Sequence, residues 1–185
     1  MTEQAHRSRE FARLHGECAP KLCAWVALRL GAGLRSGVDV EDIVQEVTCR
    51  AWRRFEDFDA DRGPFVSWVL GIARNVFGEL LARLARGEPS GGQWSTGSWA
   101  HLPDDATRAT QKIARQDHLT KFARWAESLE ENDQRLLLYR GIENWPHARV
   151  GEVLGISESA ASQRWAALRD RLRDQPRMVE LLDSN

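Results

Sequence analysis

The run DIVQE, residues 42–46, carries the first group of side chains that suits a binding role. Asp42, Gln45 and Glu46 stand at i, i+3 and i+4, so a helix would place two carboxylates and an amide on one face. The run lies in an acidic segment, because residues 39–61 hold eight acids against three arginines. Such a face complements a basic partner surface. The plainer alternative is a solvated helix face.

A second group combines aromatic rings with cations, which is the combination that captures single-stranded nucleic acid. Bases stack on aromatic faces, arginines neutralise phosphates, and an asparagine can form paired hydrogen bonds with a base edge. Phe65 and Trp68 also lie on an apolar helical stripe, which favours a core position for both. Packing gives no reason for Asn75 or Arg62. The group consists of Phe58, Arg62, Phe65, Trp68, Arg74 and Asn75.

The stretch GISESAASQRWAALRDRL, residues 155–172, has the form of the second helix of a helix-turn-helix. A glycine makes the turn and Ser157 caps the helix. The buried stripe is predicted at Ala161, Trp165, Leu168 and Leu172. The outward face and its flanks carry Ser159, Ser162, Gln163 and Arg164. Glutamine can pair with adenine in a major groove, but so few cations predict weak DNA binding by this part alone. A helical hairpin that only packs is the alternative.

No constellation in the sequence suits nucleophilic, acid–base or metal catalysis, so we expect a binding protein without a cofactor rather than an enzyme. His15, Cys18 and Cys23 match no common zinc spacing, and a fourth ligand is not obvious. Three cysteines on helix-like stretches indicate a reducing cytoplasm. No apolar run approaches the roughly 18 residues of a membrane span, and the N-terminus lacks the apolar core of a signal peptide.

Apolar periodicity predicts an all-α chain of two small helical domains joined by a flexible linker. The expected helices cover residues 8–30, 40–55 (after an Asp39 cap), a segment beginning near Pro64, 107–128, 132–142, 147–154 and 157–174. The domains are residues 8–86 and 107–175. Between them lies a Gly-, Ser- and Pro-rich linker, residues 87–106, with Trp94 and Trp99, and residues 176–185 form a tail. The formal net charge of −1 hides an acidic segment beside a basic one, residues 62–86.

The segment from Asp39 to Leu84 resembles conserved region 2 of the sigma-70 family, and more specifically its compact extracytoplasmic-function (ECF) group. Members of that group consist of region 2, a variable linker and region 4. The matching residues are DIVQE (42–46), Arg50-Ala51-Trp52, Phe55, Phe58, Phe65, Trp68 and IARN (72–75). LGISESAASQRWAALRDRL, residues 154–172, is similar to the helix-turn-helix of region 4.

The resemblance implies a bacterial sigma factor whose partners are core RNA polymerase and promoter DNA, both duplex and single-stranded. It places Asp42, Gln45 and Glu46 against the clamp helices of the largest polymerase subunit. It assigns the −10 element, with a flipped base near the loop 58–65, to Phe58, Arg62, Phe65, Trp68, Arg74, Asn75 and Arg83. It assigns the −35 element to Ser157, Ser159, Ser162, Gln163 and Arg164. Many members of the group are also held by an anti-sigma factor.

One departure from the family keeps other interpretations open. The family usually carries basic residues near positions 161–167, where Arg164 is the single cation here. One alternative is therefore a sigma-fold interaction protein with weakened promoter recognition. Another is a stand-alone helix-turn-helix regulator that binds duplex operator DNA as a dimer, although it leaves DIVQE and IARN unexplained.

Overall fold

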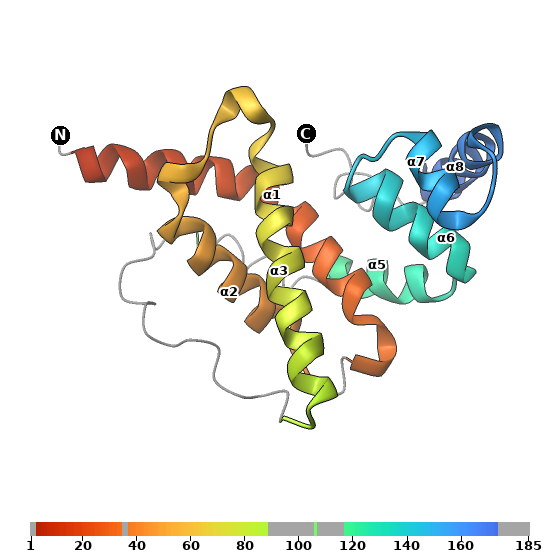
Figure 1. Ribbon diagram of the computed structural model, residues 1–185, viewed down its shortest axis with the longest axis horizontal. Coiled ribbons are helices and arrows are strands. Elements are labelled where there is room, and N and C mark those ends of the chain that lie inside the picture. The colour runs from red at the N-terminus through yellow and green to blue at the C-terminus, as the bar shows by residue number, and fades with distance from the viewer. Residues whose placement is uncertain (1–2, 35–36, 89–105, 107–116, 174–185) are drawn as a thin grey trace.

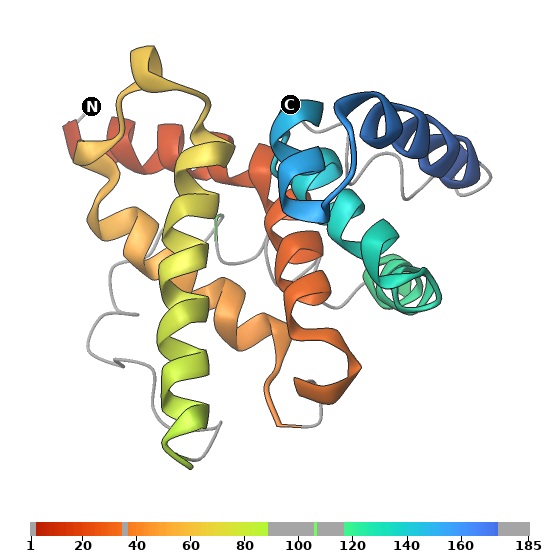
Figure 2. The ribbon, with the colours of Figure 1, turned by 45° about the vertical axis from the view of Figure 1, so that its right-hand side comes forward.

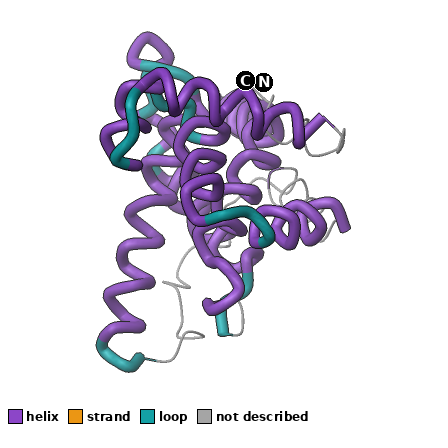
Figure 3. The backbone as a smooth tube through the Cα atoms, turned by 90° about the vertical axis from the view of Figure 1, so that its right-hand side faces the viewer, coloured by secondary structure: helices purple, strands orange, loops and turns teal. Residues whose placement is uncertain are grey.

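The computed structural model describes residues 3–34, 37–88, 106 and 117–173, and all regular elements among them are helical (Figure 3). The predicted all-α class is thus confirmed. The expected linker interior with Trp94 and Trp99, the start of the expected helix 107–128, the last residue of the helix 157–174 and the tail 176–185 lie outside the described residues.

Helix α1, Glu3–Leu34, forms the centre of the fold. It is longer than the predicted 8–30. The helical geometry is interrupted at Gly31, which adopts a left-handed φ of 52° close to the predicted end of the helix. Every residue from Lys21 to Ala27 is buried, so this part of α1 is covered on all sides rather than along one stripe.

Helices α2 and α3 cover one side of α1. Helix α2, Val40–Arg53, starts at the predicted cap, where the Asp39 carboxylate accepts a hydrogen bond from the backbone N–H of Glu41 at 2.9 Å. Two short 3₁₀ turns follow, η1 (Phe55–Asp57) and η2 (Ala60–Arg62). Helix α3, Phe65–Ala85, begins directly after Pro64, which occupies the cap position rather than the first turn.

Helix α3 is also long and apolar enough to cross a membrane, by length and composition alone, and no other described helix is. Its apolar stripe is instead used for packing. Val69, Ala73, Val76 and Leu80 are completely buried in the core shared with α1 and α2. We therefore regard α3 as a core helix.

The C-terminal half contains α5 (Asp117–Glu127), α6 (Glu131–Leu136), the π-helical turn η4 (Leu137–Ile142), α7 (His147–Leu154) and α8 (Glu158–Arg173). The pair α7–α8 is the predicted helix-turn-helix. Gly155 adopts a left-handed φ of 68° in the turn. Gly151 is needed for a different reason: a Cβ there would lie 2.7 Å from the backbone oxygen of Ile156.

The two halves of the chain pack against each other. Helix α5 and the turn η4 both contact α1, and Figures 1 and 2 show the C-terminal part of α1 between α3 and the C-terminal helices. Large apolar residues of both halves, Trp25 and Phe122 among them, are fully buried in one continuous core. The division into two domains with a linker stays a prediction, but in this structure the halves are in contact.

Candidate nucleic-acid and polymerase interface

A cavity of about 490 Å³ opens at the loop between α2 and α3. The loop is shaped by Asp59, whose carboxylate accepts from the backbone N–H of Asp61 at 2.9 Å, and by Gly63 at φ 144°. The cavity is lined by Arg54, Asp57, Phe58, Asp59, Arg62, Gly63, Pro64, Ser67 and Trp68. Three predicted DNA-binding residues, Phe58, Arg62 and Trp68, are thus brought together.

Phe65 does not belong to the wall of this cavity. It is 6% exposed and meets the half-buried ring of Phe58 edge-on, with ring centroids 5.1 Å apart. Trp68 lies 5.6 Å from Phe58, so these two rings form the aromatic wall while Phe65 supports them from the core. The expectation of direct base contact by Phe65 is therefore corrected: its ring is used for packing.

A second cavity, of about 770 Å³, lies between α2 and the middle of α3. Its lining residues are Glu46, Arg50, Arg53, Arg54, Ile72, Arg74, Asn75, Gly78 and Glu79. Four arginines against two glutamates make this lining net positive. Asn75 is exposed here, as expected for a base reader, two helical turns or about 10 Å along α3 from Trp68.

Arg50 fixes the wall of the second cavity. Its guanidinium donates two hydrogen bonds of 2.7 Å to the carboxylate of Glu79 and one of 2.7 Å to Glu46. The bonds to Glu79 are the largest cause that raises the pKa of Arg50, and the same bonds lower the pKa of Glu79. Arg50 is therefore a structural ion-pair partner, whereas Arg53 beside it is exposed. Sequence reasoning did not assign these arginines to a site, although Arg50, Arg53 and Arg54 stand at helical spacing.

Two of the cations assigned to the −10 element have partners inside the chain. The guanidinium of Arg74 donates a 2.7 Å hydrogen bond to the carboxylate of Glu143, which belongs to the C-terminal half. Arg83 lies near the end of α3, lines neither cavity and pairs with Glu88 at 3.4 Å. Arg74 is exposed and Arg83 is partly buried, but both guanidinium groups are paired in this conformation.

The polymerase-binding face predicted on α2 is smaller than expected. Asp42 is exposed and Gln45 is partly exposed, but Glu46 is only 3% exposed and binds Arg50. Glu46 points into the fold and is corrected to a structural role. Burial raises the pKa of Asp42, and the carboxylates of Asp39 and Glu41 raise it further. A basic partner would offset that repulsion.

The predicted recognition helix α8 presents Ser159, Ser162 and Gln163 to solvent. Ser157 is exposed too, and its hydroxyl accepts from the backbone N–H of Ala160 at 3.2 Å as a helix cap. The buried stripe is confirmed at Ala161, Leu168 and Leu172, whereas Trp165 is only partly buried.

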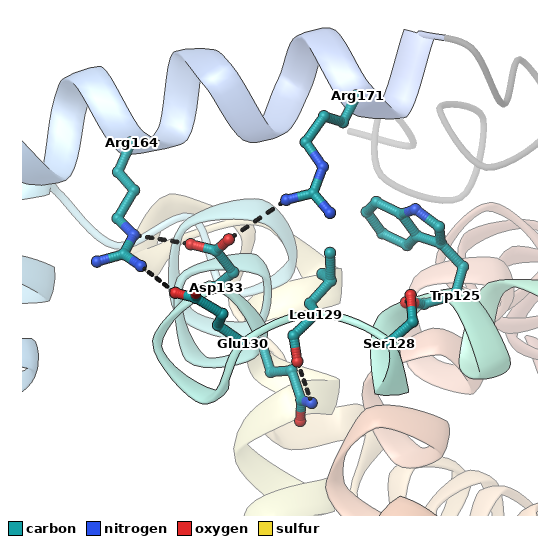
Figure 4. A network of polar contacts seen from close by, with 8 residues as sticks. Trp125, Ser128, Leu129, Glu130, Asp133, Arg164 and Arg171 are labelled. Carbon is teal, nitrogen blue, oxygen red and sulfur yellow. Dashed lines mark hydrogen bonds and ion pairs between the residues drawn. The ribbon is translucent and has the colours of Figure 1, made fainter.

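Arg164 turns away from the predicted DNA face. Figure 4 shows its guanidinium between Asp133 and Glu130, to which Nε and Nη2 donate hydrogen bonds of 2.8 Å each. Arg171 approaches the other carboxylate oxygen of Asp133 at 3.4 Å. The Nε and Nη2 donors of Arg164 therefore anchor α8 to α6 in this structure, and its contact with −35 bases stays a prediction.

Comparison with known proteins identifies the region that contains both cavities. The family model for sigma-70 region 2 matches residues 17–87. The chain is 28% identical over 139 residues to the RNA polymerase sigma factor CnrH of Cupriavidus metallidurans, which covers 72% of this chain and 71% of that protein. It is 29% identical over 153 residues to the ECF RNA polymerase sigma factor SigG of Mycobacterium tuberculosis, covering 73% of this chain and 41% of SigG.

A third relative is the ECF RNA polymerase sigma factor SigL of Mycobacterium tuberculosis, 26% identical over 139 residues, with 75% of this chain and 73% of SigL covered. No solved structure matches the chain. Residues 17–87 thus carry the sigma-70 region 2 pattern within an all-helical fold. Over about three quarters of its length, the chain is similar to sigma factors that include members of the ECF group.

Proposed function

We propose that this chain is a sigma factor, a non-catalytic subunit that binds core RNA polymerase and directs it to specific promoters. The observation that carries the proposal is the loop cavity walled by Phe58 and Trp68, with Arg62 on its rim, inside the segment that matches region 2. An aromatic wall beside a cation suits an extruded base and its phosphate.

Single-stranded DNA of the −10 element would run along α3 from the loop cavity to the second cavity. A flipped base enters the loop cavity and stacks on Phe58 or Trp68, a contact type worth about 1–3 kcal/mol per base. Asn75, about 10 Å further along the helix, reads a second base edge. Arg53 and Arg74 supply cations to the backbone in that cavity.

The remaining contacts are distributed over the exposed faces described above. Asp42 and Gln45 dock on the basic clamp helices of the largest polymerase subunit. Ser159, Ser162 and Gln163 contact the −35 element in the major groove. With Arg164 committed to α6, that contact is weak, and the polymerase supplies most of the affinity. Such a protein works in the cytoplasm, and the ECF group makes an anti-sigma factor a further proposed partner.

The test is transcription in vitro with bacterial core polymerase on a library of randomised promoters, read by sequencing of the transcript starts. Asn75→Ala should change the preferred −10 sequence and leave the −35 preference intact. Gln163→Ala, which also removes an exposed amide, should change the preferred −35 sequence and leave the −10 preference intact. The proposal fails if no start sites depend on the chain. Sequence-specific binding to duplex library DNA without polymerase would indicate the stand-alone regulator instead.

A further inference from the structure

The junction between the two halves is organised around one carboxylate, that of Glu143. Its side chain is fully buried, and three side chains of the N-terminal half approach its carboxylate. Trp25 Nε1 donates to Glu143 Oε1 at 2.7 Å, and Arg74 Nη2 donates to Oε2 at 2.7 Å. Arg29 Nη2 lies 3.9 Å from Oε1, too far for a hydrogen bond.

The backbone around Glu143 is shaped so that it reaches this position. Its N–H bonds to the carbonyl of Leu138, five residues earlier, at the end of the π-helical turn η4. Asn144 follows with φ 55°, a conformation that is uncommon outside glycine. A left-handed Asn just after the C-cap is a common helix end, and together with the π-turn it directs the Glu143 side chain toward the N-terminal half.

The pocket that receives Glu143 contains a donor group that Glu143 does not use. Arg29 Nε is buried and has no hydrogen-bond partner within the described residues, and its Nη2 only approaches the carboxylate. A backbone phosphate of DNA carries one negative charge on two unesterified oxygens, as a carboxylate does, and it can take donors from two arginines at once. Arg74 also lines the second cavity, on the proposed path of the DNA strand.

We propose that Trp25, Arg29 and Arg74 form an anion site for a backbone phosphate of single-stranded DNA, which Glu143 occupies in the free chain. Glu143 thereby holds the two halves together and competes with the DNA for Arg74. Core polymerase, the partner in the proposed function on which this inference rests, would vacate the site by holding the two halves apart. The apparent affinity of the free chain for the DNA strand is therefore the affinity of the open form multiplied by the fraction of the chain that is open.

The test uses the full chain without polymerase and a fluorescein-labelled oligothymidylate of about 12 nucleotides, within the usual range of single-strand binding sites. Affinity is measured by fluorescence anisotropy at low and at moderate salt. Glu143→Gln is compared with Glu79→Gln, which also removes one arginine-bound carboxylate but lies within the N-terminal half. Both variants change the net charge equally, so general electrostatic attraction cancels in the comparison.

Glu143→Gln should bind the oligonucleotide about 5-fold more tightly than Glu79→Gln, because a larger fraction of the chain is open. Its radius of gyration in small-angle scattering should also rise, while that of Glu79→Gln should not. The double variant Glu143→Gln/Arg74→Gln should open in the same way but lose the gain in affinity. Equal affinities for the two single variants, or a gain that survives the loss of Arg74, would overturn the proposal.

Trp25→Phe provides a second route if Glu143→Gln loses its helical circular-dichroism signal. It removes one donor to Glu143 and keeps an aromatic ring, so the chain should open and its radius of gyration should rise. Because the same N–H would also bind the phosphate, affinity for the oligonucleotide should rise less than for Glu143→Gln. An unchanged radius of gyration would overturn the inference. Binding to core polymerase is measured separately by co-elution. Failure of the anion site and failure of the proposed sigma function are therefore distinguishable.

Discussion

Replacement of Arg164 should destabilise the helix-turn-helix rather than change which promoter sequence is read. Its Nε bonds to Asp133, whose side chain is 13% exposed, and its Nη2 bonds to Glu130, whose side chain is 78% exposed. Hydrogen bonds to charged groups contribute about 1.5–3 kcal/mol when sheltered, and exposed ion pairs about 0.2–1 kcal/mol. The Asp133 bond therefore dominates, and because Arg164 is itself 35% exposed, its contribution belongs at the low end.

For Arg164→Ala we expect a loss of about 2 kcal/mol in the free energy of unfolding. A double-mutant cycle with Asp133→Ala, followed by urea denaturation, should give a coupling energy of about 1–1.5 kcal/mol. Arg171 approaches the same carboxylate. Asp133→Ala alone should therefore lower the free energy of unfolding by somewhat more than the coupling energy between Arg164 and Asp133. Glu130→Ala is the matched control and should cost under about 0.5 kcal/mol.

The same variant separates anchoring from DNA reading. In the promoter-library assay, Arg164→Ala should lower the yield of transcripts uniformly and keep the −35 preference of the parent chain. A coupling energy near zero, together with a changed base preference at one −35 position, would refute the assignment of Arg164 to α6.

Two further predictions concern the core of each half. Gly151→Ala should lower the free energy of unfolding by about 1–3 kcal/mol in thermal or urea unfolding, because the new Cβ would lie 2.7 Å from a backbone oxygen. Gly141→Ala should lower it less, because its Cβ would lie 2.9 Å from the ring edge of Trp165, which can move. Burial lowers the pKa of His15 to about 4, so the unfolded chain takes up a proton that the folded chain excludes as pH falls from 6.5 to 4. Relative to His15→Gln, the chain should lose about 3 kcal/mol of stability over that window in urea titrations, and a pH-independent difference would show that His15 is not held neutral.

Much of the fold follows from local signals in the sequence. The Asp39 cap, the glycine turn before α8 and the stripe of Ala161, Leu168 and Leu172 all depend on residues within a few positions of one another. Such patterns are set by helix geometry, so they can be predicted without knowledge of the tertiary structure.

The parts that differ depend on which helices approach each other. Glu46 has helical spacing that is compatible with an exposed face, yet a neighbouring arginine and the α2–α3 contact bury it. Arg164 finds its partners 31 and 34 positions earlier in the chain, and Arg74 finds Glu143 69 positions later. Periodicity carries no information about such pairs.

One signal in the sequence does anticipate the packing of the two halves. The run LCAWVA, residues 22–27, is apolar on every side of a helix, whereas a helix covered on one face needs only a stripe. The structure buries all of it, with α2 and α3 on one side of α1 and α5 on another. A helix that is apolar on every side needs packing partners on more than one side, so the composition of α1 required a second element to cover it.

The most direct test of the central claim is whether the chain binds core RNA polymerase through α2. Purified chain and bacterial core polymerase are mixed and separated on a sizing column. We expect the parent chain to co-elute with the polymerase and Asp42→Arg/Gln45→Ala to co-elute clearly less. Glu130→Arg, which changes the charge of the C-terminal half by the same amount, should still co-elute. A parent chain that elutes alone would contradict the assignment as a sigma factor.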